Sequence, residues 1–150
     1  MEGKRIILVV EDDEFVRRAI ERYCSAYAPT LSVATVRDAL EALGQDLVAI
    51  VLDIDLPDGS GLTVLEKLRE RDPALPVLIH SGHIDSLVSI HAHRHGAELL
   101  GKSGDLTRLR DFVKRAVRAR RDSEPRQATV DDTGESTPTV KPSAVGESSS

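Results

Sequence analysis

The sequence predicts an α/β fold, a doubly wound sandwich in which helices cover both faces of a parallel sheet. Along residues 1–121, apolar runs of strand length alternate with stretches whose apolar residues recur at helical spacing. Prolines and glycines, among them Pro29, Gly44 and Pro73, fall between these segments, where the chain is expected to turn. Because strand–helix–strand crossovers are right-handed, the successive units should build one continuous sheet between two helical layers.

Five apolar runs are candidate strands. Ile6–Val10 and Leu47–Leu52 are apolar throughout, which is typical of central strands that are buried on both faces. The candidate strands span residues 6–10, 31–36, 47–52, 76–80 and 97–100.

A helical pattern follows each of these runs. Apolar residues three and four positions apart lie on one face of a helix, which can then pack on the sheet. The residues that define the patterns are Phe15, Val16, Ala19, Ile20 and Tyr23; Ala39, Leu40 and Leu43; Leu62, Leu65 and Leu68; a weaker set within residues 85–95; and Leu106, Leu109, Phe112, Val113, Ala116 and Val117.

Composition divides the 150 residues into two parts. Residues 122–150 contain no Leu, Ile, Met or aromatic residue and carry six acidic residues against two basic ones. Such a segment buries too little apolar surface to offset the entropy of ordering it, so we expect a folded domain at 1–121 and a disordered tail at 122–150. A single cysteine excludes a disulfide within the chain and a cysteine-only zinc cluster. No run is long enough to span a membrane and no signal pattern is visible, so the expected compartment is the cytoplasm.

The residues that could bind a ligand or take part in chemistry follow the carboxyl ends of the strands, which is where ligands bind in a doubly wound sheet. The segments that follow the first, third, fourth and fifth strands are Glu11-Asp12-Asp13, Asp53-Ile54-Asp55, His80-Ser81-Gly82 and Gly101-Lys102-Ser103. Carboxylates gathered in one crevice repel each other, and oxygen ligands favour Mg²⁺ over zinc as the cation that relieves the repulsion. A lysine and a hydroxyl across the same crevice suit phosphoryl transfer to a carboxylate. Asp13 and Asp58 are instead expected to cap helices or form turns.

The ordered set of motifs resembles the receiver (CheY-like) domain of two-component response regulators. The matching pieces are VVED at 9–12, VLDIDLPDGSGL at 51–62, LIHSG at 78–82 and GAELLGK at 96–102. The resemblance implies a flavodoxin-like (βα)5 sandwich whose five-stranded parallel sheet has the strand order 2-1-3-4-5. It also implies that Asp53 is the phospho-accepting aspartate. The implied Mg²⁺ ligands are Glu11, Asp12, Asp53 and the main-chain carbonyl of Asp55.

The fourth and fifth strands carry two further matches to the family, and the fifth is also the place of two departures from it. Ser81 matches the switch Ser/Thr, and Lys102 matches the lysine that pairs with the phosphoryl group. Leu99 stands where many receivers have Tyr or Phe, so the usual aromatic switch cannot operate as such. Ser103 replaces the proline that usually follows the lysine, so a trans peptide bond is expected there.

Histidines crowd the segment that follows the fourth strand. His83 and Asp55 flank the predicted site and are candidates for tuning the access of water to the phosphoryl group. His91 and His95 share a helix face and are a possible metal pair. We favour a solvated helix surface with some pH sensitivity, because the sequence offers no further ligand set. The last helix is basic, and a solvated face again explains it better than nucleic-acid binding, since it lacks a DNA-reading motif.

The sequence therefore predicts a single-domain response regulator rather than an enzyme. Asp53 would accept a phosphoryl group, with Mg²⁺, from a sensor histidine kinase or a histidine phosphotransfer protein, and the domain would signal to a downstream protein target. Neither a membrane nor a nucleic acid is expected as a partner. Two alternatives stay open: an Mg²⁺-dependent phosphohydrolase, because Asp53-Ile54-Asp55 also looks like the haloacid dehalogenase motif, and a phosphorylation-independent interaction module.

Overall fold

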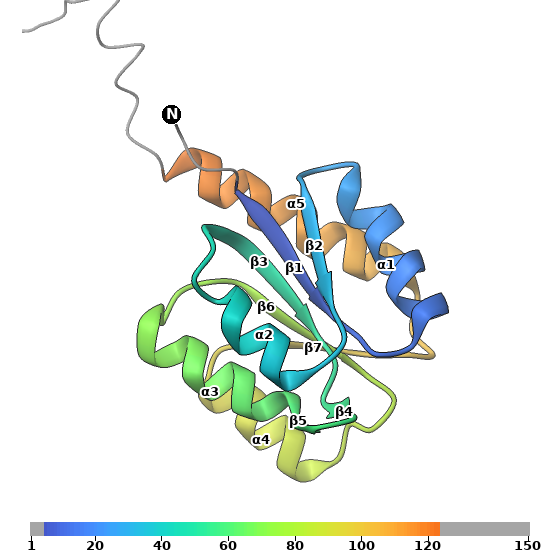
Figure 1. Ribbon diagram of the computed structural model, residues 1–150. Helices are drawn as coiled ribbons and strands as arrows, with labels where there is room; N and C mark the ends of the chain where they lie inside the picture. Colours follow the sequence, from blue (N-terminus) through green and yellow to red (C-terminus); the bar gives the residue numbers. More distant parts are fainter. Residues whose placement is uncertain (1–4, 124–150) are drawn as a thin grey trace, which may run out of the picture. The chain divides into compact units, whose positions relative to one another are not determined.

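A computed structural model describes residues 5–123, and those up to Arg120 belong to one compact unit. The centre of this unit is a five-stranded parallel sheet in the order β2-β1-β3-β6-β7 (Figure 1). Its strands are β1 (Ile6–Val10), β2 (Thr30–Val33), β3 (Leu47–Leu52), β6 (Val77–Ser81) and β7 (Glu98–Gly101). Counted along the chain without the small β4–β5 hairpin, this is the predicted order 2-1-3-4-5. Most of the predicted tail at 122–150 lies outside the described residues.

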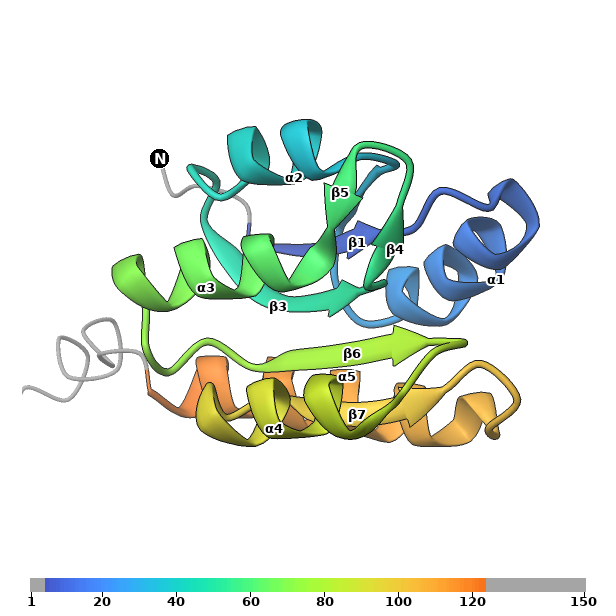
Figure 2. The same cartoon turned by 90° about the horizontal axis from the view of Figure 1, so that it is seen from below.

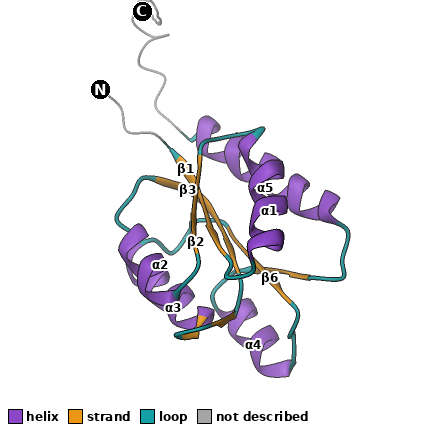
Figure 3. Ribbon diagram, turned by 45° about the vertical axis from the view of Figure 1, so that its right-hand side comes forward, coloured by secondary structure: helices purple, strands orange, loops and turns teal. Residues whose placement is uncertain are grey.

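Helices cover both faces of the sheet, as a doubly wound fold requires (Figure 3). The helices are α1 (Glu14–Ser25), α2 (Val36–Ala42), α3 (Gly61–Arg71), α4 (Ser86–Arg94) and α5 (Leu106–Asp122). One apolar core lies between the sheet and α2, α3 and α4, and a second lies between the sheet and α1 and α5. Cys24 belongs to the second core, where burial raises the pKa of its thiol to about 12. No helix of the described residues is both long and apolar enough to cross a membrane.

Apart from one-residue shifts at β6 and β7, the predicted elements differ from the structure at two places. The second strand ends at Val33 rather than Val36, because the Thr35 side chain accepts a hydrogen bond from the main-chain N–H of Asp38 and caps α2. The loop after β3 also contains a short antiparallel hairpin, β4 (Asp55–Leu56) and β5 (Gly59–Ser60), that no pattern predicts (Figure 2).

The two aspartates predicted to cap helices or form turns both bond to helix starts. Asp13 is the N-cap of α1 and accepts from the main-chain N–H groups of Phe15 and Val16. Asp58 lies in the turn between β4 and β5, but its carboxylate accepts from the N–H groups of Val36 (2.7 Å) and Arg37 (3.0 Å) at the start of α2. These two bonds lower the pKa of Asp58 and hold the hairpin turn against α2.

Candidate functional site

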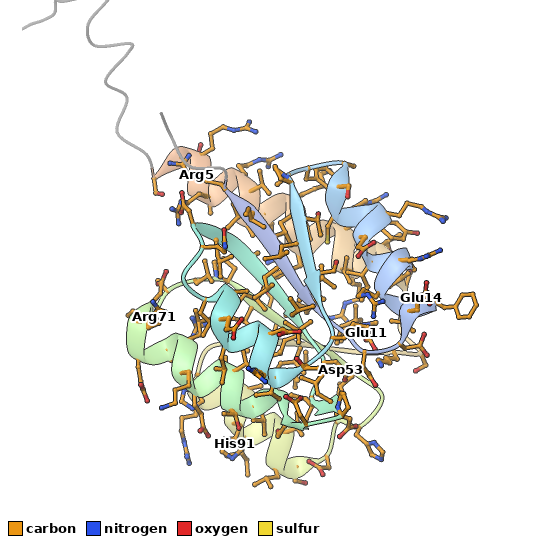
Figure 4. The ribbon with its side chains drawn as sticks, in the orientation of Figure 1. Arg5, Glu11, Glu14, Asp53, Arg71 and His91 are labelled. Atoms are coloured by element: carbon orange, nitrogen blue, oxygen red, sulfur yellow. The ribbon has the colours of Figure 1, made fainter. Side chains whose placement is uncertain are left out.

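Three carboxylates meet at the carboxyl ends of β1 and β3. Val10 and Leu52 are register partners, so Glu11 and Asp53, which follow them, emerge side by side (Figure 4). Three carboxylate oxygens, one from each residue, lie within 4.8 Å of one another; the residues are Glu11, Asp12 and Asp53. Glu11 is 1% exposed and Asp53 is 2% exposed, whereas Asp12 lies at the surface. The strand register thus builds the acidic pocket that the strand-end pattern predicts.

The main chain holds these carboxylates in place. The N–H of Asp53 donates to the carbonyl of Val10 (2.9 Å), and the N–H of Glu11 donates to the carbonyl of Val33 (3.0 Å). These bonds extend the pairing of the sheet by one residue beyond each strand end. Both side chains therefore start from fixed backbone positions.

Lys102 supplies the positive charge that faces this pocket. Its Nζ donates to Oδ2 of Asp53 (3.0 Å) and to Oε2 of Glu11 (3.2 Å). The pKa of Glu11 is raised to about 7, because burial and the nearby Asp53 charge outweigh the opposing effects of the Asp13 N–H bond and of Lys102. Burial alone would lower the pKa of Lys102, but its bonds to the two carboxylates outweigh burial and raise it. Lys102 thus offsets part of the repulsion between two buried acids.

Gly61 fits under the acidic pocket because it has no side chain. Its N–H donates to the carbonyl of Ile54 (2.7 Å) at the start of α3. A Cβ at this position would overlap the main-chain carbonyl oxygen of Asp53. Gly59 in the same loop has φ 155°, a conformation that favours glycine. The two glycines let the chain pass directly beneath Asp53 and enter α3.

The β6 side of the site contains Ser81 and His83, and the other predicted tuning residue, Asp55, approaches it from β4. Ser81 is buried, and its Oγ accepts a hydrogen bond from the N–H of His83 (3.2 Å). Nδ1 of His83 lies 3.1 Å from Oδ2 of Asp55, and these side chains are 82% and 65% exposed. The sequence proposed Asp55 and His83 separately, and the structure brings them together as a pair.

The positions at which the sequence departs from the family are ordinary in backbone conformation. The peptide bond between Lys102 and Ser103 is trans as expected, since residues 5–123 contain no cis peptide bond. Leu99 is half-buried, pairs with Ile79 across the sheet and packs on the core beneath α2, α3 and α4. An aliphatic side chain therefore fills the position of the family's aromatic residue.

His80 is a residue of this site to which sequence reasoning gave no role. It is 3% exposed, and neither ring nitrogen has a hydrogen-bond partner among the described residues. Burial lowers the pKa of His80, and the charge of Lys102 lowers it further. With Lys102 and Phe15, His80 lines a cavity of about 250 Å³ beside α1. The sequence signal that could have drawn attention to His80 is its place inside an otherwise apolar strand.

The basic last helix is partly neutralised by acidic neighbours. Arg115 donates to both carboxylate oxygens of Glu98 (3.0 and 3.2 Å), and Arg120 donates to Asp46 (2.6 Å). These contacts are consistent with a solvated helix face.

Comparison with known proteins connects this geometry to a family. The family model described as "Response regulator receiver domain" matches residues 7–114. The chain belongs to this family. Receiver domains are signalling modules of two-component systems, so the membership confirms the resemblance on which the sequence interpretation rests. The family also has an acidic pocket, to which the cluster of Glu11, Asp12 and Asp53 corresponds.

Curated relatives of this receiver domain are much longer proteins. It is 35% identical over 136 residues to the response regulator protein PilR of Pseudomonas aeruginosa, covering 87% of this chain and 30% of the relative. It is 32% identical over 115 residues to the DNA-binding transcriptional regulator NtrC of Escherichia coli, covering 75% of this chain and 24% of the relative. The chain therefore spans less than a third of the length of either relative.

A solved structure confirms the fold. A CheY-like response regulator receiver domain protein from Methanospirillum hungatei JF-1 superposes with a TM-score of 0.73 at 20% identity. The match covers 81% of this chain and all of the other. The receiver domain described above is thus the predicted flavodoxin-like sandwich.

Proposed function

We propose that this receiver domain accepts a phosphoryl group on Asp53 from a phosphohistidine donor, a sensor histidine kinase or a histidine phosphotransfer protein. The observation that carries the proposal is the position of Lys102, whose amine bonds both Asp53 and Glu11 at the carboxyl ends of β1 and β3. A nucleophilic carboxylate, a second carboxylate and a fixed cation are the parts that phosphoryl transfer to an aspartate needs.

The acidic pocket suits a magnesium ion. Its donors are all oxygens, which is the ligand set that Mg²⁺ prefers. Oε1 of Glu11 is buried and accepts no hydrogen bond from the described residues, and its 3.2 Å approach to Nζ of Lys102 shows that it already faces a positive charge. Glu11, Asp12, Asp53 and the main-chain carbonyl of Asp55 would hold the ion. When bound, it would neutralise charge on the phosphoryl oxygens.

The residues of the chain then have separate roles in the transfer. An Asp53 carboxylate oxygen forms the new bond to phosphorus while the phosphorus–nitrogen bond of the donor histidine breaks, and the leaving imidazole keeps that electron pair. Lys102 is placed to donate to a phosphoryl oxygen. Ser81 accepts from the N–H of His83, which leaves its own O–H available to donate to another phosphoryl oxygen.

Acetyl phosphate with Mg²⁺, followed by intact mass measurement, tests the proposal. We expect the wild-type chain to gain one phosphoryl group and Asp53→Asn to gain none. Asp38→Asn is the matched control, because Asp38 is an exposed aspartate in the first turn of α2, and it should be phosphorylated like the wild type. Equal labelling of Asp53→Asn and the wild type would overturn the assignment of Asp53.

The same experiment separates the alternatives. Steady release of phosphate from phosphate esters would favour the phosphohydrolase, and no uptake under any condition would favour a phosphorylation-independent module. Action as a single-domain regulator, a cytoplasmic location, a protein target and the absence of a nucleic-acid partner stay predictions. Comparing proteins that bind the phosphorylated chain with those that bind Asp53→Asn would identify such a target.

A further inference from the structure

A second cluster of metal-ligating side chains lies between α3 and α4, away from the acidic pocket. Glu66 is on α3, His91 is on α4, and His95 is the C-cap of α4. One ligand atom from each of the three lie within 4.8 Å of one another. We infer that Glu66, His91 and His95 bind a divalent transition metal ion of the zinc class that bridges α3 and α4.

The two histidines are arranged for shared ligation. They are four residues apart, so they lie on one face of the helix. Their rings are 6.4 Å apart between centroids and inclined by only 15°. Nδ1 of His91 is buried and has no hydrogen-bond partner among the described residues. A protein hydrogen bond therefore does not occupy this nitrogen, and the imidazole keeps capacity for a cation.

Hydrogen bonds between α3 and the end of α4 keep Glu66 beside the two histidines in the absence of a metal. Arg69, three residues after Glu66 on α3, donates through Nε to the main-chain carbonyl of His95 (2.6 Å). Its NH1 donates to the carbonyls of Asp72 (3.1 Å) and Leu75 (2.8 Å), which fixes the guanidinium. The end of α4 is thus tied to the α3 surface that carries Glu66. A preorganised ligand set of this kind loses less entropy when an ion binds.

The donor set selects the class of ion. Two imidazoles and one carboxylate suit zinc and its neighbours, whereas Mg²⁺ prefers oxygen ligands alone. Three protein ligands leave a fourth position for water or an external group. The positive charge of Arg69 lies near and opposes a cation, so we expect weaker binding than at a structural site with four protein ligands.

Zinc titration of the full chain by calorimetry, with Mg²⁺ in excess to occupy the acidic pocket, tests this inference. We expect one Zn²⁺ to bind per chain, and His91→Ala or Glu66→Gln to weaken binding by at least about tenfold. His93→Ala is the matched control, since His93 is an exposed histidine on the same helix outside the cluster, and its affinity should equal that of the wild type. Glu66 is exposed, so Glu66→Gln should keep the fold even if His91→Ala disturbs the packing.

Thermal unfolding gives a second measurement. Zinc should raise the melting temperature of the wild type and of His93→Ala more than that of Glu66→Gln at the same zinc concentration, because stabilisation by an ion grows with its affinity for the folded state. The inference is overturned if the wild type binds no zinc, or if His91→Ala and Glu66→Gln bind it as tightly as the wild type does. It is also overturned if Asp12→Asn removes zinc binding while His91→Ala keeps it, because the ion would then lie in the acidic pocket.

Discussion

The two halves of the strand-end site are built in different ways. On the β1–β3 half, Glu11 and Asp53 are almost fully buried, and their positions follow directly from the backbone pairing of adjacent strands. On the β6–β7 half, strand pairing also places Lys102, whose N–H donates to the carbonyl of Ser81 (3.1 Å), but the loop after β6 meets β4 through side chains. His83 and Asp55 meet at the surface, and the buried ring of His80 has no hydrogen-bond partner among residues 5–123.

The difference shows where the domain tolerates change. A buried side chain whose backbone is hydrogen-bonded to neighbouring strands cannot shift unless a strand or a helix moves too, because protein interiors are close-packed. An exposed contact between two side chains contributes only about 0–1 kcal/mol and can be remade by water. The acid-bearing half should therefore be sensitive to steric change, and the β6–β7 half should be open to adjustment of rate and pH response.

Gly61→Ala should produce the largest loss of stability, and it tests whether the β1–β3 half is as sensitive to steric change as we expect. The new Cβ would overlap the main-chain oxygen of Asp53, so α3 or the end of β3 must move. We expect the free energy of unfolding in urea to fall by about 2–4 kcal/mol. Phosphorylation by acetyl phosphate should fall with it, because Asp53 would be displaced from Lys102.

Gly44→Ala is the matched control. The nearest atom to a Cβ there would be the Glu41 carbonyl oxygen at 3.7 Å, an ordinary contact. We expect a change within about 1 kcal/mol of the wild type. Equal stability of the Gly61→Ala and Gly44→Ala proteins would show that the backbone beneath Asp53 has room to move, and the contrast between the two halves would be lost.

Local pattern in the sequence was sufficient for the β1–β3 half. Ile6–Val10 and Leu47–Leu52 have the predicted bounds, since a continuous apolar run leaves little choice of where a buried strand ends. The acids that follow these strands meet because β1 and β3 are neighbours, in the strand order that the resemblance to receiver domains implied. The sequence missed the β4–β5 hairpin, because its strands are two residues each and have no periodicity to detect.

The sequence did not predict contacts between distant side chains that do not follow from the order of the strands. Asp58 caps α2, which lies before it in the chain, and Asp55 meets His83 across 28 residues. Glu66 completes a ligand set with His91 and His95 only because α3 packs beside α4. The sequence interpretation rejected this histidine pair as a metal site for want of a third ligand. Side-chain packing between helices supplied that ligand, and no local pattern records such packing.

His80→Leu tests the β6–β7 half through pH. Burial holds the pKa of folded His80 below the ordinary 6.5, so below pH 6.5 the unfolded chain binds a proton that the folded chain does not. The wild type should lose stability relative to His80→Leu as the pH falls below 6.5, by at most about 1.4 kcal/mol per pH unit. Above that pH, the difference between the two proteins should be constant.

Urea denaturation of both proteins across this pH range measures the effect. Glu11 contributes with the opposite sign, because its raised pKa makes the folded state bind a proton below about pH 7 and so favours folding as the pH falls. Both proteins contain Glu11, so the difference between them isolates His80. A pH-independent difference would mean that His80 takes up a proton in the folded state without cost, and its burial would then have no electrostatic consequence.

The smallest effect is expected at the exposed pair of Asp55 and His83, and it concerns rate rather than stability. If this pair screens Asp53 from water, His83→Ala should speed the loss of the phosphoryl group. A contact between exposed groups is worth about 0.2–1 kcal/mol, which corresponds to a change in rate of about 1.5- to fivefold.

Because the two side chains act as one unit, Asp55→Ala and the double variant should give the same rate as His83→Ala, and His93→Ala should give the wild-type rate. Effects of the single variants that add in the double variant would show that the two residues act on the phosphoryl group independently, and rates equal to the wild type would remove both from any tuning role.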